Sequence, residues 1–127
     1  MTKYSLVVKM STLTLLLGVV TREDLELQPL DVKTVFLHGD LDEDNYMSQP
    51  TCFRVLGEES RLLCGLKKSL YGLKQASRMW YQKFDFYIRQ LGYDNHRFDS
   101  DPCMYCRQLA DESPIYLILH VEDMLIA

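Results

Sequence analysis

The stretch Ile115-Tyr-Leu-Ile-Leu-His-Val-Glu-Asp-Met-Leu-Ile-Ala127 consists of two apolar runs around two acidic residues. Residues 115–121 are nearly all apolar or aromatic, which is typical of a buried β-strand, and Met124 begins a second run of the same kind. The polar pair between the runs indicates a hairpin whose tip carries Glu122 and Asp123. A natural domain rarely stops in the middle of a strand, so we expect that the chain is truncated there.

Two helices are predicted before this hairpin. Residues 77–91 carry an apolar stripe at helical spacing, and Gly92 supplies a stop. A second apolar face lies within residues 11–22; it mimics a secretion signal but is too short to span a membrane, and acidic residues follow it. A core helix is therefore the better interpretation. The stripe of the later helix comprises Trp80, Phe84, Tyr87, Ile88 and Leu91.

Short extended segments fill the space between the two helices. Residues 25–28 alternate as a strand does, Pro29 interrupts them, and residues 30–36 resume extended character. An acidic loop follows at 39–44, and residues 62–66 alternate again. These elements predict an α+β fold, a small antiparallel sheet with both helices packed on one of its faces.

Charge is distributed unevenly along the 127 residues. The formal net charge is −4, which does not suggest a nucleic-acid binder. Between Glu59 and Asp85, however, there are six basic residues and no acidic one. This basic segment is either a solvated lysine-rich face or a surface that contacts phosphate. Its basic residues are Arg61, Lys67, Lys68, Lys74, Arg78 and Lys83.

The four cysteines do not have the spacing of a zinc site. Cys103 and Cys106 form a lone C-x-x-C without a second pair, and on a strand their side chains point to opposite faces. Cys52 and Cys64 lie apart from them. We therefore expect reduced thiols, no disulfide partner and an intracellular protein, cytoplasmic or nuclear.

Three carboxylates fall at predicted strand ends, Asp31 at one end and Glu122 with Asp123 at the hairpin tip. Nucleotidyl transfer needs two divalent ions about 3.5–4 Å apart, held by a few carboxylates and by phosphate and water oxygens. Adjacent strand ends could supply such ligands. Spacing alone is equally consistent with solvated carboxylates in turns.

The residues around these carboxylates resemble the reverse transcriptase of copia-type LTR retrotransposons. Residues 30–43, Leu-Asp-Val-Lys-Thr-Val-Phe-Leu-His-Gly-Asp-Leu-Asp-Glu, resemble the first catalytic motif of that family. Residues 66–76, Leu-Lys-Lys-Ser-Leu-Tyr-Gly-Leu-Lys-Gln-Ala, resemble its nucleotide- and template-handling stretch, and residues 120–126 resemble its hairpin motif. The resemblance runs from about Tyr4 to the end, in sequence order.

The resemblance implies a role for each matching position. Asp31, Glu122 and Asp123 would be the catalytic residues and the metal ligands, with two Mg²⁺ ions if the chain is active. Phe36 matches the aromatic gate that excludes a ribose 2′-hydroxyl. The nucleotide-binding set is Phe36, Tyr71, Gly72 and Lys74, and the nucleic-acid-binding set is Lys67, Lys68 and Arg78.

Three departures from the family pattern bear on activity. Active relatives read Tyr-Val-Asp-Asp where this chain has His120-Val-Glu-Asp, so Glu122 carries its carboxylate about 1.5 Å further out. A misplacement near 1 Å can cost about 10²-fold in rate. Pro29 would disturb the strand that positions Asp31, and Cys52 replaces a glycine, which would strain a turn that needs positive φ.

The expected function is RNA-directed DNA polymerase by descent, using two-metal nucleotidyl transfer. We expect residues 1–127 to form a partial reverse transcriptase domain, a palm with a remnant of the fingers and no thumb. Its partners would be an RNA/DNA primer-template and dNTP, with no membrane. The fragment itself is expected to be degenerate and inactive. The alternatives are a non-catalytic nucleic-acid-binding remnant and a translated transposon relic without a role.

Overall fold

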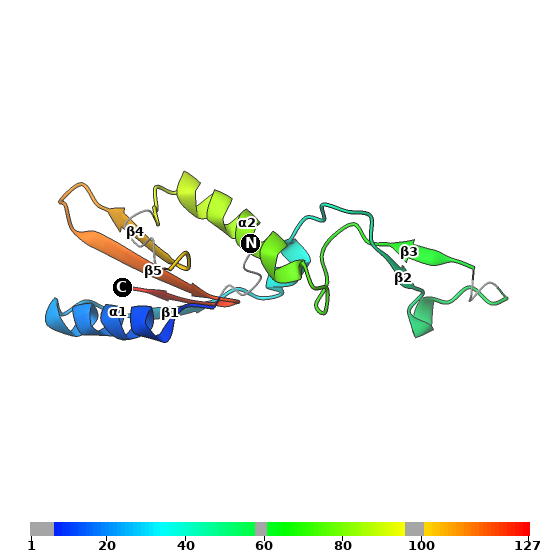
Figure 1. Ribbon diagram of the computed structural model, residues 1–127, viewed down its shortest axis with the longest axis horizontal. Helices are drawn as coiled ribbons and strands as arrows, with labels where there is room; N and C mark the ends of the chain where they lie inside the picture. Colours follow the sequence, from blue (N-terminus) through cyan, green and yellow to red (C-terminus); the bar gives the residue numbers. More distant parts are fainter. Residues whose placement is uncertain (1–6, 58–60, 96–100) are drawn as a thin grey trace.

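The computed structural model describes residues 7–57, 61–95 and 101–127 (Figure 1). The strands and helices named below are those of these residues. In chain order they are α1 (Met10–Arg22), β1 (Gln28–Asp31), the 3-10 helix η1 (Val35–His38), β2 (Tyr46–Ser48), the 3-10 helix η2 (Thr51–Phe53), β3 (Leu63–Gly65), α2 (Ala76–Gln90), β4 (Met104–Gln108), β5 (Pro114–His120) and β6 (Asp123–Ile126).

The terminal hairpin is confirmed as the pair β5 and β6. It lies inside a four-stranded antiparallel sheet whose strands are ordered β1-β6-β5-β4. Leu117 and Leu119 of β5 are at most 3% exposed. Burial of an aliphatic side chain of this size contributes about 1.5–3 kcal/mol, so this apolar strand anchors the sheet.

The α+β class is confirmed, but the two helices pack on opposite faces of the sheet. Successive side chains of a strand point to opposite faces. Leu117 and Leu119 therefore reach α2, whereas Ile118 between them packs with Leu16 of α1 and Met104. The prediction of one shared face was wrong, because a strand that is apolar at every position can bury both of its sides.

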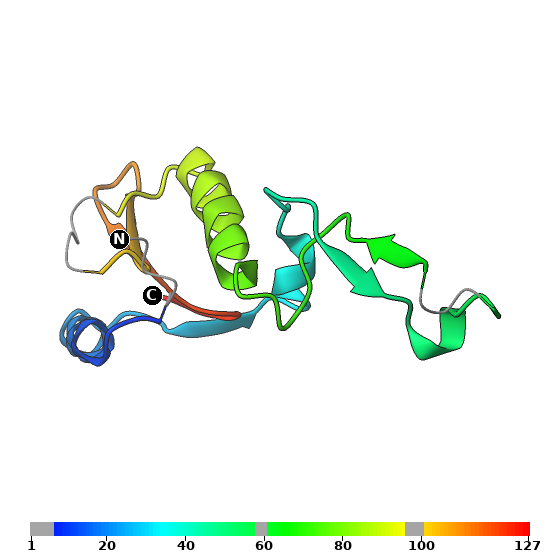
Figure 2. The ribbon, with the colours of Figure 1, turned by 45° about the vertical axis from the view of Figure 1, so that its right-hand side comes forward.

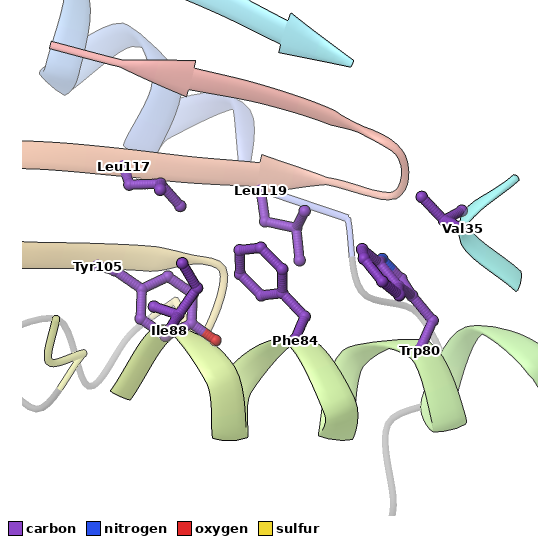
Figure 3. Close-up of a cluster of buried hydrophobic side chains, with 7 residues drawn as sticks. All are labelled: Val35, Trp80, Phe84, Ile88, Tyr105, Leu117 and Leu119. Carbon is purple, nitrogen blue, oxygen red and sulfur yellow. The ribbon is translucent and has the colours of Figure 1, made fainter. Parts of the chain in front are cut away.

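The core between α2 and the sheet holds the aromatic residues (Figure 3). Phe84 lies between two other rings, with centroids 5.7 Å from Trp80 and 5.8 Å from Tyr105. Two residues predicted to extend the stripe do not: Tyr87 is 59% and Leu91 43% exposed, because they lie on the flank of the helix turned away from the sheet. The members of this α2 core are Val35, Trp80, Phe84, Ile88, Tyr105, Leu117 and Leu119.

The segment from 25 to 38 differs from its prediction. Extended structure is limited to β1, and Val35–His38 forms η1 in place of a strand. Thr34 takes a left-handed conformation with φ 54°, which turns the chain so that Val35 is fully buried in the α2 core. The chain therefore leaves the extended path after β1, and Val35 packs in the core beside α2.

Strands β2 and β3 form a separate two-stranded sheet that projects away from the four-stranded one (Figures 1 and 2). We call the described residues of this segment, 46–57 and 61–65, the arm. Its large apolar side chains are open to solvent, with Phe53 80% and Leu56 90% exposed. Cys52 lies within η2 and is not among the described residues of positive φ, so the strain expected there is absent.

Neither helix in the described ranges is long and apolar enough to cross a membrane. The predicted core helix at 11–22 is confirmed as α1, with Leu16 fully buried against the sheet. The four cysteines are free thiols. Cys103 and Cys106 are both buried.

Candidate nucleotide and metal site

Strand pairing brings two of the three predicted carboxylates side by side. Asp31 at the end of β1 is the register partner of Asp123 at the start of β6, and Asp123 is in turn the partner of His120 on β5. Residues that are directly opposite on neighbouring strands project from the same face, with Cβ atoms about 4.5–5.5 Å apart. All three side chains are exposed, so they form an open polar row at the hairpin end of the sheet.

The row lies on the face opposite α2. Met124 and Ile126 pack against the α2 core, so their alternating neighbours Asp123 and Leu125 point to the α1 side. A largely apolar groove of about 560 Å³ runs along this side, with Asp31, His120 and Asp123 among its lining residues. No local sequence pattern predicts this groove, because its shape depends on where α1 packs.

Two hydrogen bonds hold the hairpin tip. The indole Nε1 of Trp80 donates to the carbonyl of Val121 at 2.9 Å, and the amide of Val32 donates to the carbonyl of Glu122 at 3.0 Å. Val121 has φ 57°, which is rare for a β-branched residue and carries strain. The α2 core and β1 together therefore fix the turn that carries Glu122.

The three carboxylates do not converge as a metal centre. Within the described ranges, no three His, Cys, Asp or Glu side chains lie close enough together to hold a metal ion. Asp31 and Asp123 are register partners, whereas Glu122 lies in the turn between β5 and β6, outside that pair. The ligand set expected from sequence is therefore only partly assembled.

Pro29 is accommodated in β1 without the loss expected for it. Among the strands of the described residues, β1 is an edge strand that pairs with β6 alone. Hydrogen-bonded and non-bonded pairs alternate along an antiparallel ladder. The bond from Val32 to Glu122 therefore makes the pair of Pro29 with Leu125 a non-bonded one, where no N–H is needed. The expected disturbance of the strand was wrong, because it assumed a central position in the sheet.

Two residues of the predicted nucleotide-binding set are in contact. The rings of Phe36 and Tyr71 meet edge to face, with centroids 4.8 Å apart and an interplanar angle of 65°. Phe36 is half-buried against the α2 core, whereas Tyr71 is 51% exposed. Gly72 beside it has φ +94°, a conformation that favours glycine.

Lys74 lies close to the start of α2. It lines a hollow of about 620 Å³ together with Glu43, Gln75 and Arg78. Gln75, the N-cap residue of α2, makes no side-chain capping bond. The Nε atom of Arg78 is buried without a hydrogen-bond partner. The hollow thus gathers two cationic side chains near one carboxylate.

Half of the predicted basic segment is already paired with the acidic loop. Asp40 accepts hydrogen bonds from Lys68 and from Lys83, the latter at 3.2 Å, and Arg78 bonds Asp42 at 3.1 Å. The lysine partners, Lys68 first, lower the pKa of the Asp40 carboxyl, and Asp40 raises the pKa of Lys68. The opposite charges of residues 39–44 and of the basic segment are the sequence signal that could have predicted these ion pairs.

Comparison with known proteins places the chain among transposon proteins. Residues 2–127 match the model of a family described as reverse transcriptase (RNA-dependent DNA polymerase). The chain is 48% identical over 123 residues to the retrovirus-related Pol polyprotein from transposon TNT 1-94 of Nicotiana tabacum, which covers 97% of this chain and 9% of that protein. Its identity to the Pol polyprotein from transposon RE1 of Arabidopsis thaliana is 37%, over 97% of this chain and 8% of that one.

A third relative is shorter. The putative transposon Ty5-1 protein of Saccharomyces cerevisiae is 33% identical over 98 residues, which are 77% of this chain and 30% of the yeast protein. The chain thus spans less than a tenth of the two plant polyproteins and under a third of the yeast protein. No solved structure gives a significant match.

Proposed function

The chain belongs to the reverse transcriptase (RNA-dependent DNA polymerase) family, and we propose that it is part of the palm of a copia-type RNA-directed DNA polymerase. The observation that carries this proposal is the register of β1 with β6, which puts Asp31 opposite Asp123 at the end of the sheet. The contact of Phe36 with Tyr71 supports it, because the gate and nucleotide positions of the family then lie together.

In such a polymerase the protein positions the nucleotide and balances charge on its phosphates. The family's two Mg²⁺ ions would activate the primer hydroxyl and neutralise the phosphates. Asp31 and Asp123 are the residues of this chain best placed toward them, with Glu122 in the third position. Phe36 would lie against the sugar, and Tyr71, Gly72 and Lys74 would lie beside the nucleotide.

We propose further that this chain by itself does not polymerise DNA. Mg²⁺ requires near-ideal octahedral geometry at about 2.0–2.1 Å, so ligand placement must be accurate. Glu122 is a methylene longer than the family's aspartate, and its turn is outside the Asp31 and Asp123 pair. The three carboxylates do not converge in the described part of the chain.

A primer extension assay tests both proposals. We expect the purified chain to incorporate no more dTTP on poly(rA) primed with oligo(dT) than its Asp31→Ala variant does, with Mg²⁺ or with Mn²⁺. Glu122→Asp restores the family's side-chain length and is the variant best placed to gain activity. Incorporation by the unaltered chain that is lost in Asp31→Ala would overturn the proposal that this chain by itself is inactive.

A second candidate function is non-catalytic binding of RNA or DNA. It is favoured by Lys67 and Lys74, which are exposed and, among the residues described, make no ion pair. Charge reversal of both lysines should weaken binding of a labelled oligonucleotide, and binding should fall steeply with salt. Binding that does not change with salt would exclude this function.

The remaining alternative is a translated relic without a role. It predicts a marginally stable fold, because a chain without a role is under no selection to keep its two cores well packed. A cooperative unfolding transition of the purified chain would argue against the unstable form of this alternative.

A further inference from the structure

The acidic loop at 39–44 lies against the basic segment and pairs with several of its cations. Asp40 bridges Lys68, just after the arm, and Lys83 of α2, and Asp42 pairs with Arg78 in the first turn of that helix. Glu43 lines the hollow that also holds Lys74. Three of the four acidic residues of this loop thus face the cations proposed to contact nucleic acid.

These ion pairs are open to solvent and can be displaced. The side chains of Lys68 and Asp40 are 53% and 68% exposed, and Asp42 is 58% exposed. Exposed pairs contribute little to stability, so another anion can replace the carboxylate at small cost. Phosphate competes well for Arg78, because a guanidinium can bond phosphate through two parallel N–H groups.

A tight backbone contact that involves no charged group anchors the start of the acidic loop. Gly39 is buried where an added Cβ would lie 3.1 Å from Met79 and 3.3 Å from Ser69, and the Gly39 carbonyl accepts the amide of Ser69 at 3.0 Å. The loop therefore starts from a tight backbone contact with the residue next to Lys68. Neutralising Asp40 and Asp42 should leave this contact intact.

We infer that the acidic loop is an internal counter-ion that occupies the nucleic-acid-binding surface, and that a phosphate backbone binds there by displacing Asp40 and Asp42. This inference rests on the proposed contact of the basic segment with RNA or DNA. It predicts that neutralising Asp40 and Asp42 strengthens nucleic-acid binding, because in the unaltered chain these two carboxylates compete with phosphate for the cations.

Fluorescence anisotropy with a labelled oligo(dT) strand tests this in three proteins. They are the unaltered chain, the variant Asp40→Asn/Asp42→Asn and the control variant Glu26→Gln/Glu112→Gln, which changes the net charge equally at exposed positions outside the loop. We expect the first variant to bind several-fold more tightly than the control. Its log–log salt dependence should steepen by up to about two, because three released cations each contribute about 0.7 on a single strand.

Amine labelling followed by mass spectrometry gives an independent readout without nucleic acid. Lys67 and Lys68 are adjacent and exposed. Asp40 bonds the Lys68 ammonium and raises its pKa, so Lys68 should react more slowly than Lys67. In the Asp40→Asn/Asp42→Asn variant the two lysines should react alike. Equal reactivity in the unaltered chain would overturn the inference, whatever the oligonucleotide does.

The outcomes separate the inference from the function beneath it. If the unaltered chain binds oligo(dT) and the loop variant binds no better than the control, the inference falls and nucleic-acid binding stands. If only the loop variant binds, the inference is supported and the free chain is masked. If none of the three proteins binds, both are overturned.

Discussion

The four-stranded sheet with α1 and α2, which we call the body, and the arm both contain large apolar residues but are stabilised in different ways. The body buries apolar side chains on both faces of its sheet, against α1 and α2. The arm pairs two strands of three residues each and leaves Tyr46, Phe53 and Leu63 more than half exposed. A lone two-stranded sheet is marginal in water, so the arm depends on the rest of the chain in a way that the body does not.

This difference shows that apolar residues stabilise a strand only where their side chains are buried against another layer. A strand is stabilised by packing of its face against another layer, and β5 has such a layer on each side. Strands β2 and β3 have hydrogen bonds to each other but no large buried side chain, with Gln49 beyond β2 as a buried polar residue of the arm region. The free energy of unfolding should therefore come mainly from the body.

Replacement of Trp80 should produce the largest loss of stability. Trp80→Ala removes a buried ring from the α2 core and the hydrogen bond to Val121, and large-to-small changes of this kind cost about 3–5 kcal/mol. Urea denaturation followed by circular dichroism measures the loss. Tyr87→Ala, on the exposed side of the same helix, is the matched control and should change stability by less than about 0.5 kcal/mol. Equal effects would contradict the packing described here.

Thiol reactivity should distinguish the body from the arm directly. Burial raises the pKa of Cys103 to about 12, whereas Cys52 is exposed in the arm. Alkylation by iodoacetamide near neutral pH should modify exposed Cys52 first, because the raised pKa of Cys103 makes its thiolate fraction about 10³-fold smaller than that of a thiol with the ordinary pKa of 9.0. Peptide mapping over time measures both sites in the same sample.

The same shift predicts how stability depends on pH. The folded chain favours the neutral Cys103 thiol, so this contribution is complete below the ordinary pKa of 9.0 and is lost as the pH rises toward about 12. Denaturation midpoints should therefore fall across that alkaline range. In a Cys103→Ala variant, this part of the decline should be absent.

Replacement of Pro29 should have a smaller effect, and its sign is informative. If proline strained β1, Pro29→Ala would stabilise the chain. The non-bonded edge position instead predicts a modest loss, of about 0.4–1 kcal/mol, because alanine gives the unfolded chain more freedom. A clear gain in the thermal midpoint would show that β1 is strained.

Polar replacements in the arm should have the smallest effect on folding. Phe53→Ser and Leu63→Thr remove exposed apolar surface, so we expect changes in unfolding free energy within about 0.5 kcal/mol. The same variants should reduce self-association, measured by light scattering at increasing concentration. A large loss of stability would mean that the arm packs against the body in solution.

The parts of the fold that could be predicted are those with a local period. The hairpin at 115–127 and the stripe of Trp80, Phe84 and Ile88 carry their own pattern, so their elements were found correctly. Tyr87 and Leu91 were wrongly included in this stripe, because they lie at helical positions that do not face the sheet. The placement of α1 and α2 on opposite faces could not be read from either helix alone, because it is decided by the alternation of β5.

The adjacency of two candidate carboxylates could be predicted from the sequence, whereas the contacts around them could not. Asp31 and Asp123 were named from sequence, and their register pairs them. The contact of Phe36 with Tyr71 joins segments far apart in sequence, and so does the bridging of Lys68 and Lys83 by Asp40. Such contacts depend on loop closure and on tertiary packing, which no local pattern records.

Pro29 has a consequence beyond the fold of one molecule. β1 is an outer strand, and the side of it that faces away from β6 could template strand addition from a neighbouring chain. Because Pro29 is at a non-bonded pair, the donor that it lacks would have pointed toward that neighbour. The proline that was expected to disturb the strand carrying Asp31 thus interrupts the ladder of backbone hydrogen bonds that a further strand would need in order to add to β1.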